Sequence, residues 1–171
     1  LHDFTALSFD GVDDYVEVTN TGQFDFGLND FTIEFVARGH EDKRHQVIGT
    51  KDGFNNSAGF FFQRASNPPE MYFGIGDGTN ARWVNVANLK GDFPSSMFSF
   101  VRTGNTLKCY IDGNMVFDVT GYGYNIQNSS NLIMGREPNG GYPFNGLITE
   151  VRIWNVARTA QQIADWKDRT L

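Results

Sequence analysis

The chain has 171 residues, of which 40% are hydrophobic and 20% are charged, and its formal net charge is −6. This length suits one domain that buries its core without disulfides, and the acidic balance, with no basic run longer than Lys43-Arg44, argues against a nucleic-acid partner. No run of about 18 apolar residues occurs, so membrane insertion is not expected.

An acidic turn follows the first strand-like residues, at positions 10–14. It supplies three carboxylates and a flexible glycine. Ca²⁺ is a hard cation that takes roughly six to eight oxygen ligands, so Asp10 and Asp13 are candidate calcium ligands. An ordinary acidic turn capped by Asp10 accounts for the same residues, and the sequence leaves both interpretations open.

Alternation of apolar and polar residues dominates the chain from position 15 onward. In residues 31–36, Phe31, Ile33 and Phe35 share one face and polar residues occupy much of the other. This period predicts antiparallel strands with one face in the core and one in water. The sixteen Phe residues also favour sheets, since Phe suits a pleated, half-buried surface.

The polar segment 39–45 contains two of the three histidines, His40 and His45. Their spacing is a weak zinc signal, and a solvated loop is the simpler interpretation. The chain shows no pair of carboxylates at alternate strand positions, no nucleophile elbow and no phosphate-binding loop. Catalysis is therefore not expected.

Several segments present aromatic and amide side chains in a pattern that suits a glycan. Trp83 and Asn85 share one face of a predicted strand, and glycine-rich loops carry Tyr122, Tyr124 and Tyr142. Aromatic rings in loops are hard to explain as core, because loops run over the surface. Sugar rings stack on aromatic faces while their hydroxyls pair with planar polar groups, so these five residues are candidate contacts. Packing is the alternative for each of them.

Two arginines lie beside aromatic residues. Arg64 ends the run Phe60-Phe61-Phe62-Gln63, and Arg82 precedes Trp83. A guanidinium in such a place can grip the carboxylate or sulfate of an acidic sugar. A surface arginine at the end of a strand is the alternative interpretation for both.

The last third of the chain contains a predicted hairpin and the only convincing helix. Asp112-Gly113 separates two alternating runs, which is a strong hairpin signal. Cys109 alternates with apolar neighbours and is expected to be a buried thiol. Thr159 and Gln162 have the spacing of a capping box and predict a short helix after them. About ten to thirteen short strands with glycine-rich turns indicate a sandwich or jelly roll.

Four segments carry a family pattern: residues 7–16, 31–35, 107–113 and 146–155. Together they resemble the laminin-G-like, concanavalin-A-like jelly roll domains of secreted bacterial and extracellular proteins. The chain departs from the pattern at residues 97–101, where a tryptophan-histidine pair is usual, and at Val36, where tryptophan is common. The resemblance implies an all-β, two-sheet antiparallel jelly roll with one short C-terminal helix, forming a single domain over residues 1–171.

The resemblance also implies a structural Ca²⁺ between the N-terminal turn and the C-terminal strand, which adds Glu150 to Asp10 and Asp13 as a candidate ligand. We therefore expect a non-catalytic carbohydrate-binding or adhesion module, secreted or at the cell surface, cut from a larger exported protein. Its expected partner is a glycan or polysaccharide. A protein-interaction or structural module is the alternative, and a polysaccharide lyase or hydrolase of the same fold is a third possibility.

Overall fold

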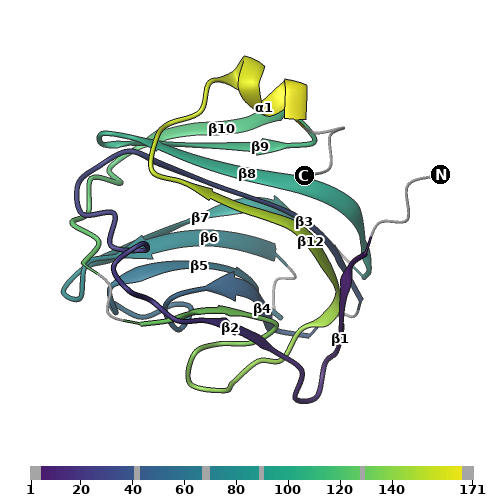
Figure 1. The fold of residues 1–171 in the computed structure, drawn as a ribbon. Helices are drawn as coiled ribbons and strands as arrows, with labels where there is room; N and C mark the ends of the chain where they lie inside the picture. Colours follow the sequence, from purple (N-terminus) through teal and green to yellow (C-terminus); the bar gives the residue numbers. More distant parts are fainter. Residues whose placement is uncertain (1–4, 41–42, 67–69, 89–90, 128–129, 167–171) are drawn as a thin grey trace.

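The computed structural model describes residues 5–40, 43–66, 70–88, 91–127 and 130–166. Two six-stranded antiparallel sheets lie face to face (Figure 1). In spatial order, the strands of sheet A are β1 (Leu7–Asp10), β12 (Asn145–Trp154), β3 (Phe31–Gly39), β8 (Phe93–Thr103), β9 (Thr106–Ile111) and β10 (Asn114–Thr120). Those of sheet B are β2 (Val16–Val18), β11 (Leu132–Met134), β4 (His45–Gly49), β5 (Gly59–Arg64), β6 (Glu70–Gly76) and β7 (Ala81–Asn88). The expected two-sheet jelly roll is confirmed.

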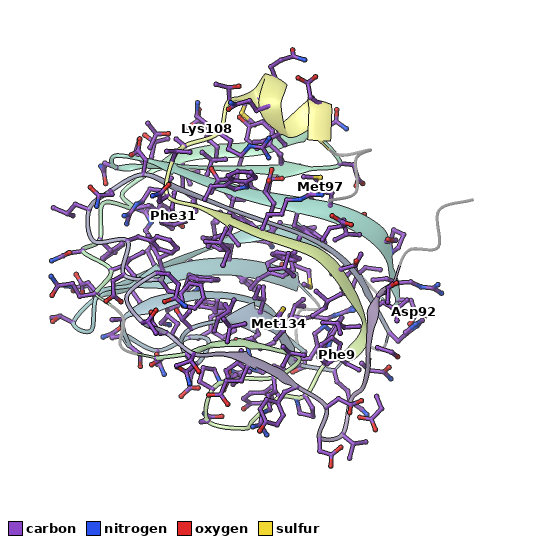
Figure 2. All side chains as sticks on the ribbon, viewed as in Figure 1. Phe9, Phe31, Asp92, Met97, Lys108 and Met134 are labelled. Atoms are coloured by element: carbon purple, nitrogen blue, oxygen red, sulfur yellow. The ribbon has the colours of Figure 1, made fainter. Side chains whose placement is uncertain are left out.

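The core lies between the sheets and is largely aromatic. Phe31 and Met134, labelled in Figure 2, are both buried in the space that side chains from the two layers fill. Phe73 of sheet B stacks on Phe100 of sheet A with ring centroids 4.0 Å apart. Cys109 is buried among these rings, as predicted, and burial raises the pKa of its thiol well above the ordinary value.

Turn chemistry places the predicted hairpin between β9 and β10. Asp112 and Gly113 connect these strands and have φ values of 50° and 79°. Positive φ at both central positions gives a turn whose twist matches that of the paired strands. The hairpin predicted from the Asp-Gly pair is therefore confirmed.

Helix α1 (Ala160–Trp166) packs on the outer face of sheet A, over β8 and β9 (Figure 1). The Gln162 backbone N–H donates to Thr159 Oγ1 at 3.2 Å, and the Thr159 N–H donates to Gln162 Oε1 at 2.9 Å. This reciprocal pair is the predicted capping box. Ile163 is fully buried against Val101 and Tyr110, which fixes the helix to the sheet.

Part of the outer face of β3 is covered by protein, which corrects the expectation that this face is in water. The face of β3 that carries Thr32 and Glu34 was predicted to be wet, but both side chains are fully buried. The Glu34 carboxylate accepts hydrogen bonds from Trp154 Nε1 at 2.9 Å and Arg158 Nη1 at 2.5 Å. Because the segment after β12 folds back over this part of β3, Thr32 and Glu34 are closed to solvent, whereas Arg38 farther along the strand is exposed.

Candidate functional site

The outer face of sheet B carries a cluster of aromatic rings. Phe54, from the loop after β4, meets Phe61 of β5, Tyr72 of β6 and Trp83 of β7 with ring centroids 5.3, 5.2 and 5.4 Å apart. All three contacts are edge-on, a favourable geometry for aromatic pairs. Phe61 is fully buried beneath Phe54, whereas Trp83 is 41% exposed. The cluster is thus anchored in the sheet and open to solvent at β7.

Strand alternation explains why these rings share a face. Phe60, Phe62 and Phe73 point into the core, so the residues between and beside them point outward. Gly74 pairs with Trp83 in the register of β6 and β7. A Cβ at position 74 would lie 2.3 Å from Cε1 of Phe61 and 2.9 Å from Cβ of Trp83. The glycine therefore makes room for both rings.

An arginine links this cluster to a second exposed ring. The Arg44 guanidinium carbon lies 3.7 Å from the ring centroid of Tyr142 and 5.4 Å from that of Phe54. Tyr142 is 41% exposed, and its backbone carbonyl accepts from the N–H of Gln46 in β4. We call Trp83, Tyr72, Phe54, Arg44 and Tyr142 the aromatic band.

A buried carboxylate holds the parts of the band together from below. Glu137 Oε1 accepts from Gln63 Nε2 at 2.9 Å, from the Gly53 N–H at 3.1 Å and from Arg44 Nη2 at 3.3 Å. Its Oε2 accepts from Asn139 Nδ2 at 3.3 Å. One side chain thereby ties β5, the loop that carries Phe54, the loop that carries Tyr142, and Arg44 into one unit.

Lys51 stabilises the loop that carries Phe54. Its Nζ donates to the carbonyl oxygens of Asp52, Gly53 and Asn55 at 3.0, 2.5 and 2.8 Å, and it lies 4.7 Å from the ring centroid of Phe61. Burial lowers the pKa of Lys51 to about 8, against the raising effect of the charges on Asp52 and Glu137. The loop is therefore folded around an ammonium group.

Three of the predicted ligand contacts lie on this face of sheet B. Trp83 and Tyr142 are the two ends of the band. Asn85 is exposed and pairs with Tyr72 in the register of β6 and β7, which puts it beside the band. The sequence pattern thus identified residues from two separate segments that the fold brings to one surface.

Three other predicted contacts gather at a different place. Arg82 is exposed, but its side chain points to the opposite face of β7 from its neighbour Trp83. Its guanidinium carbon lies 5.3 Å from the ring centroid of Tyr122. Tyr122 is 1% exposed and belongs to the core, and burial raises its pKa to about 12. The prediction of Tyr122 as a surface contact is thus corrected: the glycines around it allow the loop to turn inward. Tyr124 is partly buried and packs against the same core.

The structure also corrects Arg64. This side chain is fully buried, and its Nη1 donates to the carbonyl oxygen of Gly91 at 2.6 Å. A guanidinium that holds a neighbouring loop from inside the protein does not reach the carboxylate of an external sugar. The predicted grip on an acidic sugar therefore does not apply to Arg64.

The acidic turn brings three carboxylates together. Oxygen atoms of Asp10, Asp13 and Asp14 all lie within 4.8 Å of one another, and all three residues are exposed. Glu150 does not join them: β1 pairs Asp10 with Asn145, so Glu150 lies farther along β12. Its φ of 55° marks a bulge in that strand, and its carboxylate pairs with Arg152.

The two histidines of segment 39–45 have separate surroundings. His40 Nδ1 lies 3.0 Å from the carboxylate of Asp92. His45 is buried, with its ring 5.0 Å from that of Phe144, centroid to centroid. The expectation of a solvated loop is therefore wrong for His45, because β4 begins there and draws the ring into the core.

Sequence reasoning missed Arg44, Tyr72 and Glu137. Tyr72 stands between Met71 and Phe73, both buried, so the period of two could have marked it as an outward aromatic. Arg44 and Glu137 have no comparable local signal. The hydrogen bonds that join Glu137 to Arg44 and to Gln63 span 93 and 74 residues of chain, and these residues become neighbours only in the folded sheet.

The structure is thus a two-sheet jelly roll with an exposed aromatic band on one outer face. Residues 10–164 match the family described as the concanavalin A-like lectin/glucanases superfamily, and the chain belongs to that superfamily. A search of curated protein sequences gave no match. Among the described residues, none of the helices is long and apolar enough to cross a membrane.

Solved structures share the fold at low sequence identity. The CBM40 domain of the Ruminococcus gnavus IT-sialidase, bound to α2,3-sialyllactose, superposes with a TM-score of 0.72 at 10% identity, over 94% of this chain and 95% of that one. Botulinum neurotoxin type C, which depends on interaction with two ganglioside molecules to enter cells, gives 0.71 at 16%, over 95% of this chain and 42% of that one. The NanB sialidase of Streptococcus pneumoniae gives 0.68 at 17%, over 94% and 27%. This chain therefore spans under half the length of the latter two.

Proposed function

We propose that this protein is a non-catalytic carbohydrate-binding module that binds its glycan on the outer face of sheet B. The observation that carries the proposal is the aromatic band: Trp83 and Tyr142 are each 41% exposed on one face, with polar groups between and beside them. These rings are joined by Phe54 and Arg44 into one continuous surface, and contiguous exposed apolar surface is typical of interaction sites. The carbohydrate-binding structures with the same fold support a sugar as the ligand.

The chemistry of the band suits a sugar. Its rings offer flat apolar faces for the C–H faces of pyranoses, and Asn85, Arg44 and Asn139 offer donors for hydroxyl groups. The loops that present these groups are tied to the sheet by Glu137 and Lys51. A surface that is ordered before binding loses less conformational freedom when the ligand arrives. We expect modest affinity at one site, which several copies side by side would strengthen.

The carboxylates near the band support a binding role over a hydrolytic one. Glu137 is 2% exposed and accepts four hydrogen bonds, so its oxygens are occupied within the protein. Glu70 accepts from the Tyr72 hydroxyl, and this bond raises the pKa of Tyr72 to about 12. Both acids thus act as acceptors that position neighbouring groups.

A glycan array probed with the purified protein tests the proposal. We expect selective binding that Trp83→Ala reduces at least tenfold, while Val156→Ala leaves it unchanged. Val156 is a matched control because it is also exposed, at 53%, but lies over sheet A, where its carbonyl accepts from Thr32. A folded protein that binds no glycan would contradict the proposal and would direct attention to a protein partner.

We also propose a structural Ca²⁺ at the turn of Asp10, Asp13 and Asp14, and an exported or cell-surface location. The donor set fits the ion, since carboxylate oxygens within 4.8 Å of one another are the ligands that Ca²⁺ prefers. The ion would join the turn to β1 through charge neutralisation. A rise in melting temperature on adding Ca²⁺, absent in Asp13→Asn, would support the site, and an unchanged melting temperature would count against it.

A further inference from the structure

We infer that the ligand is an uncharged glycan chain that lies across strands β4 to β7, so that several consecutive sugar rings contact the protein. This inference rests on the proposed function and specifies its ligand class. It differs from recognition of one terminal acidic sugar, in which a single residue of the glycan would make most contacts.

The length of the band is the first argument. The band runs from Tyr142, above β4, through Arg44 and Phe54 to Tyr72 on β6 and Trp83 on β7. These strands are neighbours in the order β4-β5-β6-β7, so the band crosses three inter-strand gaps of about 4.8 Å each. A surface of that extent exceeds one sugar ring and matches a run of linked rings.

The continuity of the band is the second argument. Each member contacts the next: Tyr142 with Arg44, Arg44 with Phe54, and Phe54 with both Tyr72 and Trp83. Its two ends, Tyr142 and Trp83, are equally exposed, at 41%. Trp83 lies on the edge strand of sheet B, so a chain bound there can continue past the protein. A site for a terminal sugar would instead concentrate its exposed contacts in one place.

The charge of the band is the third argument, and it favours an uncharged chain. Arg44 is paired with the buried carboxylate of Glu137. The Lys51 ammonium is buried beneath the loop and bound to three carbonyl oxygens. Arg82 points toward Tyr122 instead of the band. With a chain net charge of −6, this surface offers little attraction for a polyanion.

The experiment is calorimetric titration with cello-, xylo- and manno-oligosaccharides of one to six residues, together with the neutral glycan that binds best on the array and with 3′-sialyllactose. We expect the affinity for a neutral series to rise at least tenfold between the monosaccharide and the tetramer. Trp83→Ala and Tyr142→Ala should each reduce that gain, and Val156→Ala should preserve it. Raising NaCl from 50 to 500 mM should change the affinity less than twofold, because no charged contact is screened.

Two outcomes would overturn the inference while leaving the proposed function intact. One is an affinity that is already maximal for a mono- or disaccharide. The other is a preference for 3′-sialyllactose that weakens as salt is added. If no carbohydrate binds to the folded protein, both the inference and the proposed function are wrong. Circular dichroism of each variant distinguishes loss of a contact from loss of the fold.

Discussion

Each of the two sheets has a buried glutamate below its outer face, and the two glutamates have different effects on that face. On sheet A, buried Glu34 accepts from Arg158 and Trp154 and thereby holds the C-terminal segment down over the sheet. On sheet B, buried Glu137 accepts from Arg44 and from the loops around it, and the rings of the band stay exposed above it. A buried acid helps to cover part of one face and to build a surface on the other.

The difference lies in what each carboxylate holds. Glu34 receives groups from Trp154 and from the segment that covers it, so the part of the face around Glu34 is closed to a ligand. Glu137 receives backbone and side-chain donors from loops at the margin of sheet B, and those loops place Phe54 and Tyr142 on the face while Trp83 stays exposed. Burial of an acid alone therefore does not reveal whether a sheet face is structural or functional.

Loss of the acid on sheet A should have the largest effect. Glu34→Ala leaves the guanidinium of Arg158, itself 7% exposed, without its buried partner. We expect the free energy of unfolding to fall by about 3–5 kcal/mol, as when one member of a buried pair is removed. Urea denaturation measures this loss. Glycan affinity of the folded fraction should be unchanged, and a matching loss of affinity would show that the two faces are coupled.

Loss of the acid on sheet B should affect both properties. Glu137→Ala removes the acceptor of four hydrogen bonds, and we expect a loss of about 2–3 kcal/mol in the free energy of unfolding. Arg44 and the loop of Phe54 lose their anchor, so glycan affinity should fall more than tenfold. Titration calorimetry at a temperature where the variant is folded separates the two effects. Full affinity in a destabilised variant would contradict the role given to Glu137.

A glycine tests the geometry of the band itself. In Gly74→Ala, the added methyl would meet Phe61 and Trp83 and force one of them to move. Overpacking of this kind costs about 1–3 kcal/mol of stability. Because Trp83 is the exposed member, we expect it to move and glycan affinity to fall several-fold, with a change in tryptophan fluorescence. Unchanged fluorescence and affinity would mean that the sheet absorbs the methyl instead.

The smallest expected effect comes from pH. The pKa of Lys51 is lowered from 10.5 to about 8 in the folded protein. Between these values the unfolded chain holds one more proton than the folded one, so this group makes the free energy of unfolding rise with pH. Binding should move the other way: a neutral amine donates to fewer carbonyl oxygens, so the loop of Phe54 loosens and glycan affinity falls a few-fold around pH 8.

Lys51→Met provides the control for that pH dependence. Its side chain has similar length but carries no titrating group, so both trends around pH 8 should disappear. Affinity that falls at pH 8 equally in wild type and variant would assign the titration to another group. Denaturation and calorimetry across pH 7 to 10 supply both measurements.

Local signals were sufficient for the fold. The alternation of Phe31, Ile33 and Phe35, the Asp112-Gly113 turn and the Thr159–Gln162 cap each depend on residues close in sequence, and all three features are present. Their accuracy follows from the physics of strands, turns and caps, which is largely local.

The site was predicted only in part, because its members depend on long-range contacts. Trp83 and Tyr142 were found from composition and alternation, yet nothing near Glu137 indicates that Gln63, 74 residues away, will donate to it. The predictions of Tyr122 and Arg64 as ligand contacts were wrong for the same reason. A glycine-rich loop can turn inward as easily as outward, and a strand-end arginine can be covered by a distant loop.

The ammonium of Lys51 also takes the place that a bound cation could have in organising a loop. Its three carbonyl ligands resemble the coordination of a cation that organises a loop, but this cation is covalently attached to the chain. It cannot be diluted away, exchanged for another ion or removed by a chelator. The proposed calcium turn at Asp10 depends on the ionic composition of the medium, whereas the loop under the aromatic band keeps its own cation whatever ions the medium contains, as long as the pH stays below the pKa of Lys51.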